Sequence, residues 1–180
     1  MKIIYLAGIN NSGPGHWQYS WFERLGGVWV NHREWDQPTG EEWIADLTEA
    51  LAENPGPKIL LGHSLGSLLV SQWAAIHRDP GIQGAFLVAH PDPRSRAFPK
   101  EAKGFRAPGA VRFTYPTAIV ASRNDPYAPF DYAERLAGLW GSRMIDAGEK
   151  GHINLQSGLG DWEDGLRIFQ SFYEECLSRV

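Results

Sequence analysis

The chain has 180 residues, of which 43% are hydrophobic and 21% are charged, and its formal net charge is −4 at pH 7. These values predict a soluble globular protein with a single domain, residues 1–180. They argue against nucleic-acid binding, because no basic stripe runs along the sequence, and the single cysteine, Cys176, excludes an internal disulfide framework.

Short apolar runs in the chain alternate with amphipathic stretches. The runs that we expect to be buried strands are residues 2–7, 28–30, 58–62, 84–89, 117–121 and 143–146. The stretches with helical spacing of apolar residues are 41–53, 65–77, 129–140 and 161–177. Thr39 and Glu42 are typical of a capping box at the start of the first helix. The alternation predicts an α/β fold, with a three-layer, doubly wound parallel sheet of about six strands.

Two of the segments between these elements are long loops. Residues 10–16 are rich in Gly, Ser, Asn and Pro, and residues 90–115 contain several prolines. A loop as long as the second is usually functional or mobile. We expect it to be either the rim of a pocket or an ordinary surface excursion.

Residues 62–66 read Gly-His-Ser-Leu-Gly and fit the pattern Gly-x-Ser-x-Gly. An expected strand ends at Gly62 and an expected helix begins after Ser64, which is the strand–turn–helix setting that a nucleophile elbow requires. Ser64 then stands exposed at the end of the strand. The backbone N–H of Leu65, at a helix N-terminus, can donate to a developing oxyanion. The alternative is a glycine-rich turn in which Ser64 only caps the helix.

A neutral serine hydroxyl is a weak nucleophile and needs a base, for which six histidines compete. Enzymes with such an elbow place an acid and then a histidine after the serine in the chain. This order favours His152, in the loop after the last expected strand. The rival is His90, at the end of a strand. Its partner acid could only be Asp79, which we expect at the opposite edge of the sheet.

The acid is expected directly after the strand at residues 117–121, where Asp125 lies. Asp125 belongs to an Asn-Asp-Pro sequence, so the alternative is that it only forms a turn. We predict that Asp125 orients His152 and stabilises its imidazolium form. The weaker candidates lie within or beside expected helices or strands and are Asp131, Asp146 and Asp161.

The loop after the first strand is expected to supply the second oxyanion donor, best the backbone N–H of Ile9 and less so that of Asn10. Loops that leave the C-terminal ends of strands bind ligands in open α/β sheets. The residues of such loops that we expect to line a substrate pocket are Asn10, His16, Trp17, His90 and Phe105. The His and acidic residues lack the paired spacing of metal ligands, so we expect neither a metal nor a cofactor.

These motifs make the chain resemble, nearly end to end, a family of small serine hydrolases that includes the retinoblastoma-binding serine hydrolase. The motifs are residues 8–18 (Gly-Ile-Asn-Asn-Ser-Gly-Pro-Gly-His-Trp-Gln), 62–66, 121–127 (Ala-Ser-Arg-Asn-Asp-Pro-Tyr) and 151–154 (Gly-His-Ile-Asn), followed by Ser157-Gly158. The resemblance implies a minimal α/β-hydrolase fold without a lid domain and with strand order 2-1-3-4-5-6. It also implies that nucleophile, acid and base are Ser64, Asp125 and His152. One departure is Ala7-Gly8, where hydrolases usually have His-Gly.

The function predicted in this way is hydrolysis of a small ester, thioester or amide through an acyl-Ser64 intermediate. The alternatives are a protein- or ligand-binding module on an idle hydrolase scaffold, and acyl transfer to an alcohol or thiol. The expected partner is a small-molecule acyl substrate, without nucleic acid or membrane, and the sequence does not indicate a protein partner. We expect a cytoplasmic location, because no stretch approaches the roughly 18 apolar residues of a membrane span and the first apolar run is too short for a signal peptide.

Overall fold

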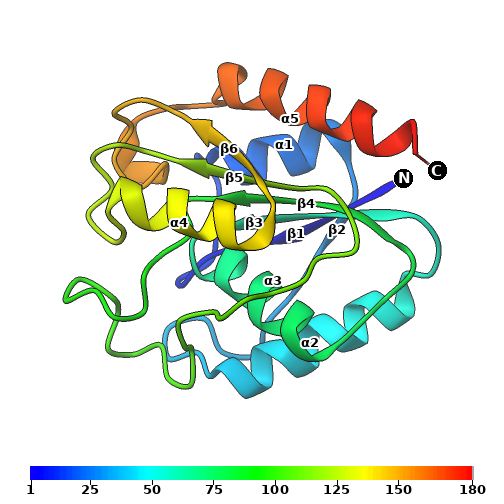
Figure 1. Cartoon of the computed structure of the whole chain (residues 1–180), viewed down its shortest axis with the longest axis horizontal. Coiled ribbons are helices and arrows are strands. Elements are labelled where there is room, and N and C mark those ends of the chain that lie inside the picture. Colours follow the sequence, from blue (N-terminus) through cyan, green and yellow to red (C-terminus); the bar gives the residue numbers. More distant parts are fainter. Residues whose placement is uncertain (180) are drawn as a thin grey trace.

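All six expected strands form one parallel sheet in the computed structural model, which describes residues 1–179 (Figure 1). The strands are β1 (Lys2–Leu6), β2 (Val28–Trp29), β3 (Lys58–His63), β4 (Ile82–Val88), β5 (Thr117–Ala121) and β6 (Arg143–Asp146). They lie in the order β2-β1-β3-β4-β5-β6, so the predicted order is confirmed. The four inner strands are almost entirely buried, and for this reason their sequences are nearly continuous in apolar residues.

Within residues 1–179, four α-helices lie between strands, and one short 3₁₀ helix and a fifth α-helix follow β6. They are α1 (Trp17–Leu25), α2 (Gly40–Glu53), α3 (Leu65–Ile76), α4 (Phe130–Trp140), η1 (Leu155–Ser157) and α5 (Glu163–Leu177). Thr39 caps α2 as expected, because its hydroxyl oxygen accepts the backbone N–H of Glu42 at 3.3 Å. The carboxylate of Glu42 accepts from the Thr39 hydroxyl at 2.7 Å instead of from the Thr39 backbone N–H of a capping box. Within residues 1–179, none of the helices has both the length and the apolar character that crossing a membrane requires.

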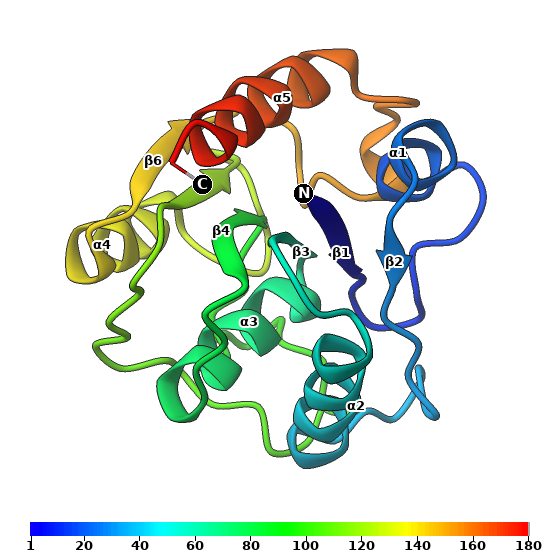
Figure 2. The same cartoon turned by 90° about the vertical axis from the view of Figure 1, so that its right-hand side faces the viewer.

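The helices cover both faces of the sheet, because alternate side chains of each strand point to opposite faces. In β1, Ile4 and Leu6 belong to a core cluster that also contains side chains of α2, α3 and α4. Ile3 and Tyr5 belong to a second cluster, which contains side chains of α1 and α5. Figure 2 shows the two helical layers on either side of the sheet. The predicted three-layer α/β fold is therefore confirmed.

Helix α1 was not among the expected elements. Aromatic residues occur on all its sides, which hides the helical period, and its polar residue Gln18 is fully buried. The Gln18 side chain donates from Nε2 to the backbone carbonyls of Leu6 and Leu61, each at 3.1 Å. The helix is therefore fixed to the ends of β1 and β3 by contacts that its own sequence does not reveal.

The segment between β4 and β5, residues 89–116, contains neither a helix nor a strand. Its middle part is nevertheless packed: Ala102, Phe105 and Val111 are buried in the core cluster on the side of α2, α3 and α4. Thr39 and Lys103 form an isolated parallel bridge. The segment is therefore not a mere surface excursion.

Candidate active site

Ser64 occupies a sharp turn between β3 and α3. Its backbone has φ 53° and ψ −123°, in a region that residues with a Cβ rarely adopt. The turn closes only because its glycines lack side chains. A Cβ on Gly66 would lie 2.1 Å from the carbonyl oxygen of Leu6, and a Cβ on Gly62 would lie 2.8 Å from Cα of Ser67. The geometry is that of the nucleophile elbow expected from the sequence.

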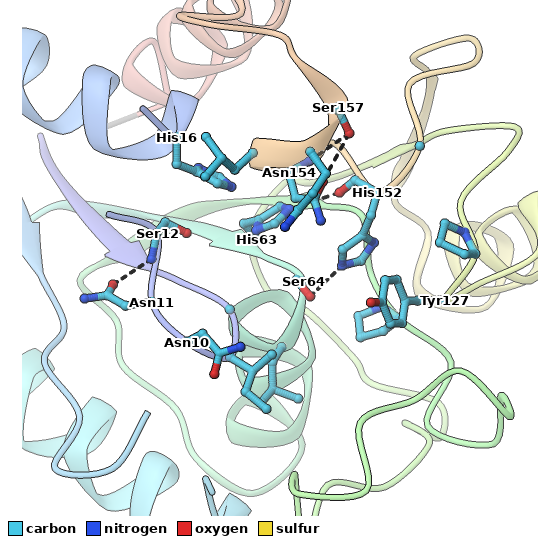
Figure 3. A pocket seen from close by; sticks show the side chains of 18 of the residues that line it. Asn10, Asn11, Ser12, His16, His63, Ser64, Tyr127, His152, Asn154 and Ser157 are labelled. Atoms are coloured by element: carbon cyan, nitrogen blue, oxygen red, sulfur yellow. Dashed lines mark hydrogen bonds between the residues drawn. The ribbon is translucent and has the colours of Figure 1, made fainter. Parts of the chain in front are cut away.

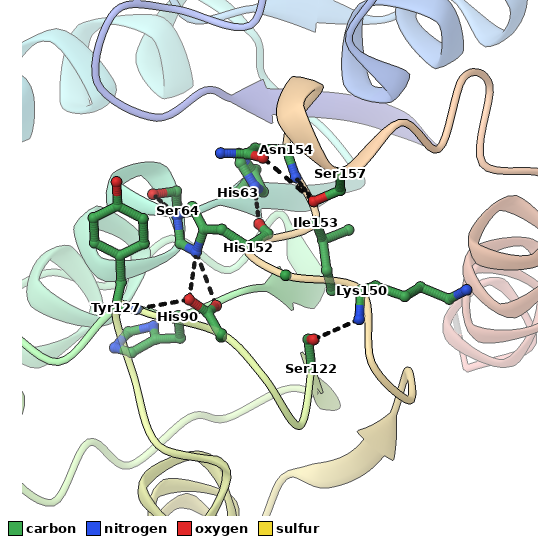
Figure 4. A network of polar contacts seen from close by, with 12 residues as sticks. His63, Ser64, His90, Ser122, Tyr127, Lys150, His152, Ile153, Asn154 and Ser157 are labelled. Carbon is green, nitrogen blue, oxygen red and sulfur yellow. Dashed lines mark hydrogen bonds and ion pairs between the residues drawn. The ribbon is translucent and has the colours of Figure 1, made fainter. Parts of the chain in front are cut away.

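His152 lies between Ser64 and Asp125. Its Nε2 atom is 2.7 Å from Oγ of Ser64, and its Nδ1 atom is 2.8 and 2.9 Å from the two carboxylate oxygens of Asp125 (Figure 4). The side chains of His152 and Asp125 are only 7% and 4% exposed. These hydrogen bonds were predicted from the sequence, and the structure contains them.

The sheet explains how three distant residues meet. Ser64 follows β3, Asp125 follows β5, and His152 follows β6. Because all strands are parallel, their carboxyl ends lie at one edge of the sheet. The three loops that leave this edge therefore converge on one place.

The loop after β5 also holds the loop that carries His152. The side chain of Asn124 accepts from the backbone N–H of Gly151 at 2.7 Å, and that of Ser122 accepts from the backbone N–H of Lys150 at 2.8 Å. Ser122 donates in turn to Asn124 at 2.8 Å. Sequence reasoning did not identify these two supports, although both lie within the motif around Asp125.

The rival acids and the rival base have other partners. Asp146 pairs with Arg123, Asp131 pairs with Arg135 on the surface, and Asp161 accepts from the hydroxyl of Ser20. Asp79 pairs with Lys58 at 2.8 Å. It precedes β4 and therefore lies at the amino edge of the sheet, as expected. His90 is buried and shares a hydrogen bond with the hydroxyl of Ser67 at 3.0 Å.

Two backbone N–H groups beside Ser64 are free to bind an oxygen. Within residues 1–179, the N–H groups of Leu65 and Ile9 have no hydrogen-bond partner, and both residues line the cavity at Ser64. The N–H of Asn10, by contrast, donates to the carbonyl of Trp35 at 3.0 Å. Gly8 leaves room here, since a Cβ on it would lie 3.0 Å from Cβ of Ser64. The geometry favours Ile9 over Asn10 as the second oxyanion donor.

A cavity of about 970 Å³ opens above Ser64 and His152 (Figure 3). Its apolar lining residues include Ile9, Leu65, Pro91, Phe98, Pro99, Pro126 and Leu155. Its uncharged polar lining residues include Asn10, Asn11, Ser12, Asn154, Gln156 and Ser157. Figure 3 shows that Asn10, Asn11 and Ser12 lie on one side of Ser64 and Tyr127 on the other. Pro91, Phe98 and Pro99 belong to the 89–116 segment, so its first part forms part of the pocket rim. This agrees with the first of the two alternatives expected for that loop.

Of the five residues expected to line the pocket, Asn10 and His16 do so. The expectation was wrong for the other three, because each points into the protein interior. The indole N–H of Trp17 donates to the carbonyl of Ile153, His90 lies against Ser67, and Phe105 packs edge-on against Trp43. All three are at most 7% exposed. His90 and Phe105 lie on the expected loop and Trp17 begins α1, but the direction of the three side chains was not foreseen.

Two further imidazoles, of His16 and His63, lie next to His152. The ring centroid of His63 is 4.8 Å from that of His16 and 5.4 Å from that of His152. Burial, with the nearby His152 ring, lowers the pKa of His16 to about 4. Burial and the two neighbouring imidazoles hold the pKa of His63 well below its ordinary value. Both rings are therefore neutral near pH 7.

Within residues 1–179, no group of three or more His, Cys, Asp or Glu side chains has an arrangement that could hold a metal ion.

Comparison with known proteins agrees with this geometry. The family model described as serine hydrolase matches residues 3–171. A YdeN-like hydrolase from Pectobacterium atrosepticum is 32% identical, with 97% of this chain and 91% of that chain covered and a TM-score of 0.85. No functionally curated protein matches the chain.

Two more distant structures share the fold. The ydeN gene product of Bacillus subtilis is 19% identical over 97% of this chain and 100% of its own, with a TM-score of 0.79. The esterase RhEst1 from a Rhodococcus species is 16% identical over 99% of this chain and 90% of its own, with a TM-score of 0.71.

Proposed function

Because the chain belongs to the serine hydrolase family, we propose that it cleaves a small ester, thioester or amide through an acyl intermediate on Ser64. One observation carries the proposal: a continuous hydrogen-bonded line runs from Asp125 through His152 to Oγ of Ser64 at the floor of an open cavity. The resemblance to the retinoblastoma-binding serine hydrolase in particular rests on the sequence motifs alone and stays a prediction.

In the acylation step, Asp125 accepts the hydrogen on Nδ1 of His152, which leaves Nε2 as an acceptor for the Ser64 hydroxyl hydrogen. As Oγ forms a bond to the substrate carbonyl carbon, Nε2 takes this proton. The carbonyl oxygen becomes an oxyanion that the N–H groups of Leu65 and Ile9 bind. Nε2 then gives its proton to the leaving oxygen, sulfur or nitrogen, whose bond to the carbonyl carbon breaks.

Deacylation repeats the same transfers with water. Nε2 of His152 takes a proton from a water molecule as its oxygen bonds to the acyl carbon. The bond from that carbon to Oγ of Ser64 breaks, the proton returns to Oγ, and the carboxylic acid leaves. Transfer to an alcohol or thiol follows the same path, with that molecule in place of water.

The lining of the cavity supports an uncharged small-molecule acyl substrate. Its walls combine apolar side chains with amide and hydroxyl groups, and its two charged non-histidine residues, Glu149 and Lys150, have opposite signs. Apolar walls with a few polar groups are typical of small-molecule sites. We therefore propose screening neutral esters with short acyl groups first.

The experiment is labelling with a fluorophosphonate probe, followed by identification of the modified residue by mass spectrometry. Ser64 of the wild type is expected to be labelled. Ser64→Ala is expected to remain folded, to lose labelling and to lower ester turnover by a factor on the order of a million. Ser71→Ala removes a hydroxyl within α3 that donates to the carbonyl of Leu68, and is the matched control. An unlabelled wild type without turnover of any neutral ester would favour the binding-module alternative.

A further inference from the structure

The loop that carries His152 contains a strained residue directly after it. Ile153 has φ 49°, in the left-handed region. That region is strongly disfavoured for a β-branched side chain. Ile153 is also fully buried, so its side chain cannot move out to relieve the strain. Surrounding contacts must therefore hold the backbone at this position.

Two buried ring nitrogens bind the backbone carbonyls before and after the strained Cα of Ile153, which are the carbonyls of His152 and of Ile153 itself. Nε2 of His63 lies 3.1 Å from the carbonyl oxygen of His152, and the indole N–H of Trp17 donates to the carbonyl oxygen of Ile153 at 2.7 Å (Figure 4 shows the first). His63 is the last residue of β3 and Trp17 the first of α1. The two donors thus come from rigid elements far from residue 152 in the sequence.

The protonation of His63 fits this role. A carbonyl oxygen only accepts, so Nε2 of His63 must carry the hydrogen and Nδ1 must be bare in the neutral ring. His16 accepts the backbone N–H of Gln18 on its Nδ1, so its hydrogen is on Nε2. Within residues 1–179, Nε2 of His16 and Nδ1 of His63 are both buried and have no hydrogen-bond partner. The hydrogen on Nε2 of the neutral His63 ring is thus directed to the carbonyl oxygen of His152.

We propose that Trp17 and His63 are positioning residues for His152. By holding both carbonyls of the strained turn, they fix the backbone from which the imidazole extends and keep its Nε2 atom 2.7 Å from Oγ of Ser64. The proposal rests on the proposed function, since it assigns the positioning of the base in that reaction. Displacement of a catalytic group by about 1 Å can cost roughly a hundredfold in rate.

The chain offers a matched pair of variants for the test, Trp17→Phe and Trp21→Phe. Trp21 lies on the same helix, is equally buried, and donates from its indole to the carbonyl of Asp161 at 2.7 Å. Both variants lose one indole N–H and the same ring volume, and we expect similar losses of thermal stability. Trp17→Phe is expected to lower kcat and the rate of fluorophosphonate labelling roughly ten- to hundredfold, with Trp21→Phe close to wild type. Equal rates in the two variants would overturn the role of Trp17.

His63 is tested by His63→Gln against His63→Leu. The glutamine amide can place an N–H near the position of Nε2, whereas leucine has no donor. We expect kcat to fall at least about tenfold further in the leucine variant, with little difference in KM, because the lost bond acts on the base. The same kcat in both variants would show that the donor to His152 is not needed.

A readout without turnover separates this proposal from the proposed function. In wild type we expect a downfield ¹H NMR signal from the hydrogen on Nδ1 of His152, which Asp125 accepts. Trp21→Phe should keep this signal, and Trp17→Phe should shift or broaden it. An inert wild type with this pattern would contradict the hydrolase mechanism alone. An unchanged signal in Trp17→Phe would contradict the positioning role, whatever the activity.

Discussion

The Nδ1 atom of His152 lies 2.8 Å and 2.9 Å from the two carboxylate oxygens of Asp125, although 27 positions separate the residues in the chain. The carboxylate is itself oriented, because it accepts the backbone N–H of Tyr127 at 2.9 Å. Contact with both oxygens requires the hydrogen on Nδ1 and leaves Nε2 as an acceptor. In the proposed mechanism, Asp125 selects that tautomer of His152.

Replacing Asp125 with Asn tests this function. An amide can donate to Nδ1 and thereby favour the wrong tautomer, so we expect ester turnover to fall by a factor on the order of ten thousand while the fold is retained. The measurement is the steady-state rate together with circular dichroism. Asp131→Asn is the control, because Asp131 is exposed and pairs only with Arg135. Equal activity of the two variants would remove Asp125 from the mechanism.

Gly66→Ala is expected to destabilise the protein severely. The added Cβ would lie 2.1 Å from the carbonyl oxygen of Leu6 and 2.6 Å from that of Ala7, and both belong to backbone that cannot yield cheaply. We expect a loss of at least about 3 kcal/mol in the free energy of unfolding, measured by urea denaturation. Gly138→Ala is the matched control. Gly138 is an exposed residue within α4 and has open space around it, so alanine should stabilise by roughly 0.5–1 kcal/mol.

Acid is expected to destabilise the fold through buried neutral histidines. Burial lowers the pKa of His90 to about 3 and, with the adjacent His152 ring, that of His16 to about 4, whereas both return to about 6.5 in the unfolded chain. Between about pH 6.5 and pH 4 the unfolded chain therefore binds protons that the folded chain does not. Stability should fall with falling pH by about 1.4 kcal/mol per pH unit for each group, and should not change from this cause above pH 7.

The measurement is urea denaturation at pH 7.5, 5.5 and 4.5 for wild type and for His90→Gln, which keeps a polar group next to Ser67. Removing one buried histidine removes one proton from the difference in proton binding between the unfolded and folded chains. The slope of the unfolding free energy against pH should therefore fall by about 1.4 kcal/mol per pH unit between pH 6.5 and 4. The acidic residues are the same in both proteins, so their contributions cancel in the comparison. Identical slopes would contradict the prediction for His90.

Lys58 and Asp79 form an ion pair at the amino edge of the sheet, and we expect substitutions of the two residues to have non-additive effects on the free energy of unfolding. The side chain of Lys58 is 2% exposed, and its ammonium group lies 2.8 Å from the carboxylate of Asp79. Asp79→Asn leaves that charge buried without its counter-ion and should cost about 3 kcal/mol of stability. Adding Lys58→Met should recover part of this loss, because the unpaired charge is removed. A double variant less stable than Asp79→Asn would exclude a dominant charge effect.

The sequence by itself determined which segments are buried strands and which three residues follow them as candidates for the site. The runs around β1, β3, β4 and β5 are nearly continuous in apolar residues because helices cover both faces, so their burial is visible in composition alone. Ser64 was identifiable because Gly-x-Ser-x-Gly lies between an expected strand and an expected helix. The clash that excludes a Cβ at Gly62 is with nearby residues of the same turn, whereas the clash at Gly66 is with the backbone of Leu6 and Ala7 and is visible only in the structure. Asp125 and His152 followed from chain order, since parallel strands bring their carboxyl ends to one edge.

Only the tertiary structure decided which way the side chains of the loops face. Trp17 was expected on a loop, but it begins helix α1, and its indole turns inward to the carbonyl of Ile153, a residue 136 positions away. Helix α1 escaped prediction because its buried Gln18 is satisfied by the carbonyls of β1 and β3. Periodicity and local turn chemistry report burial and backbone shape within a few residues. The partner of a polar group across the fold depends on packing, which the positions of all elements fix together.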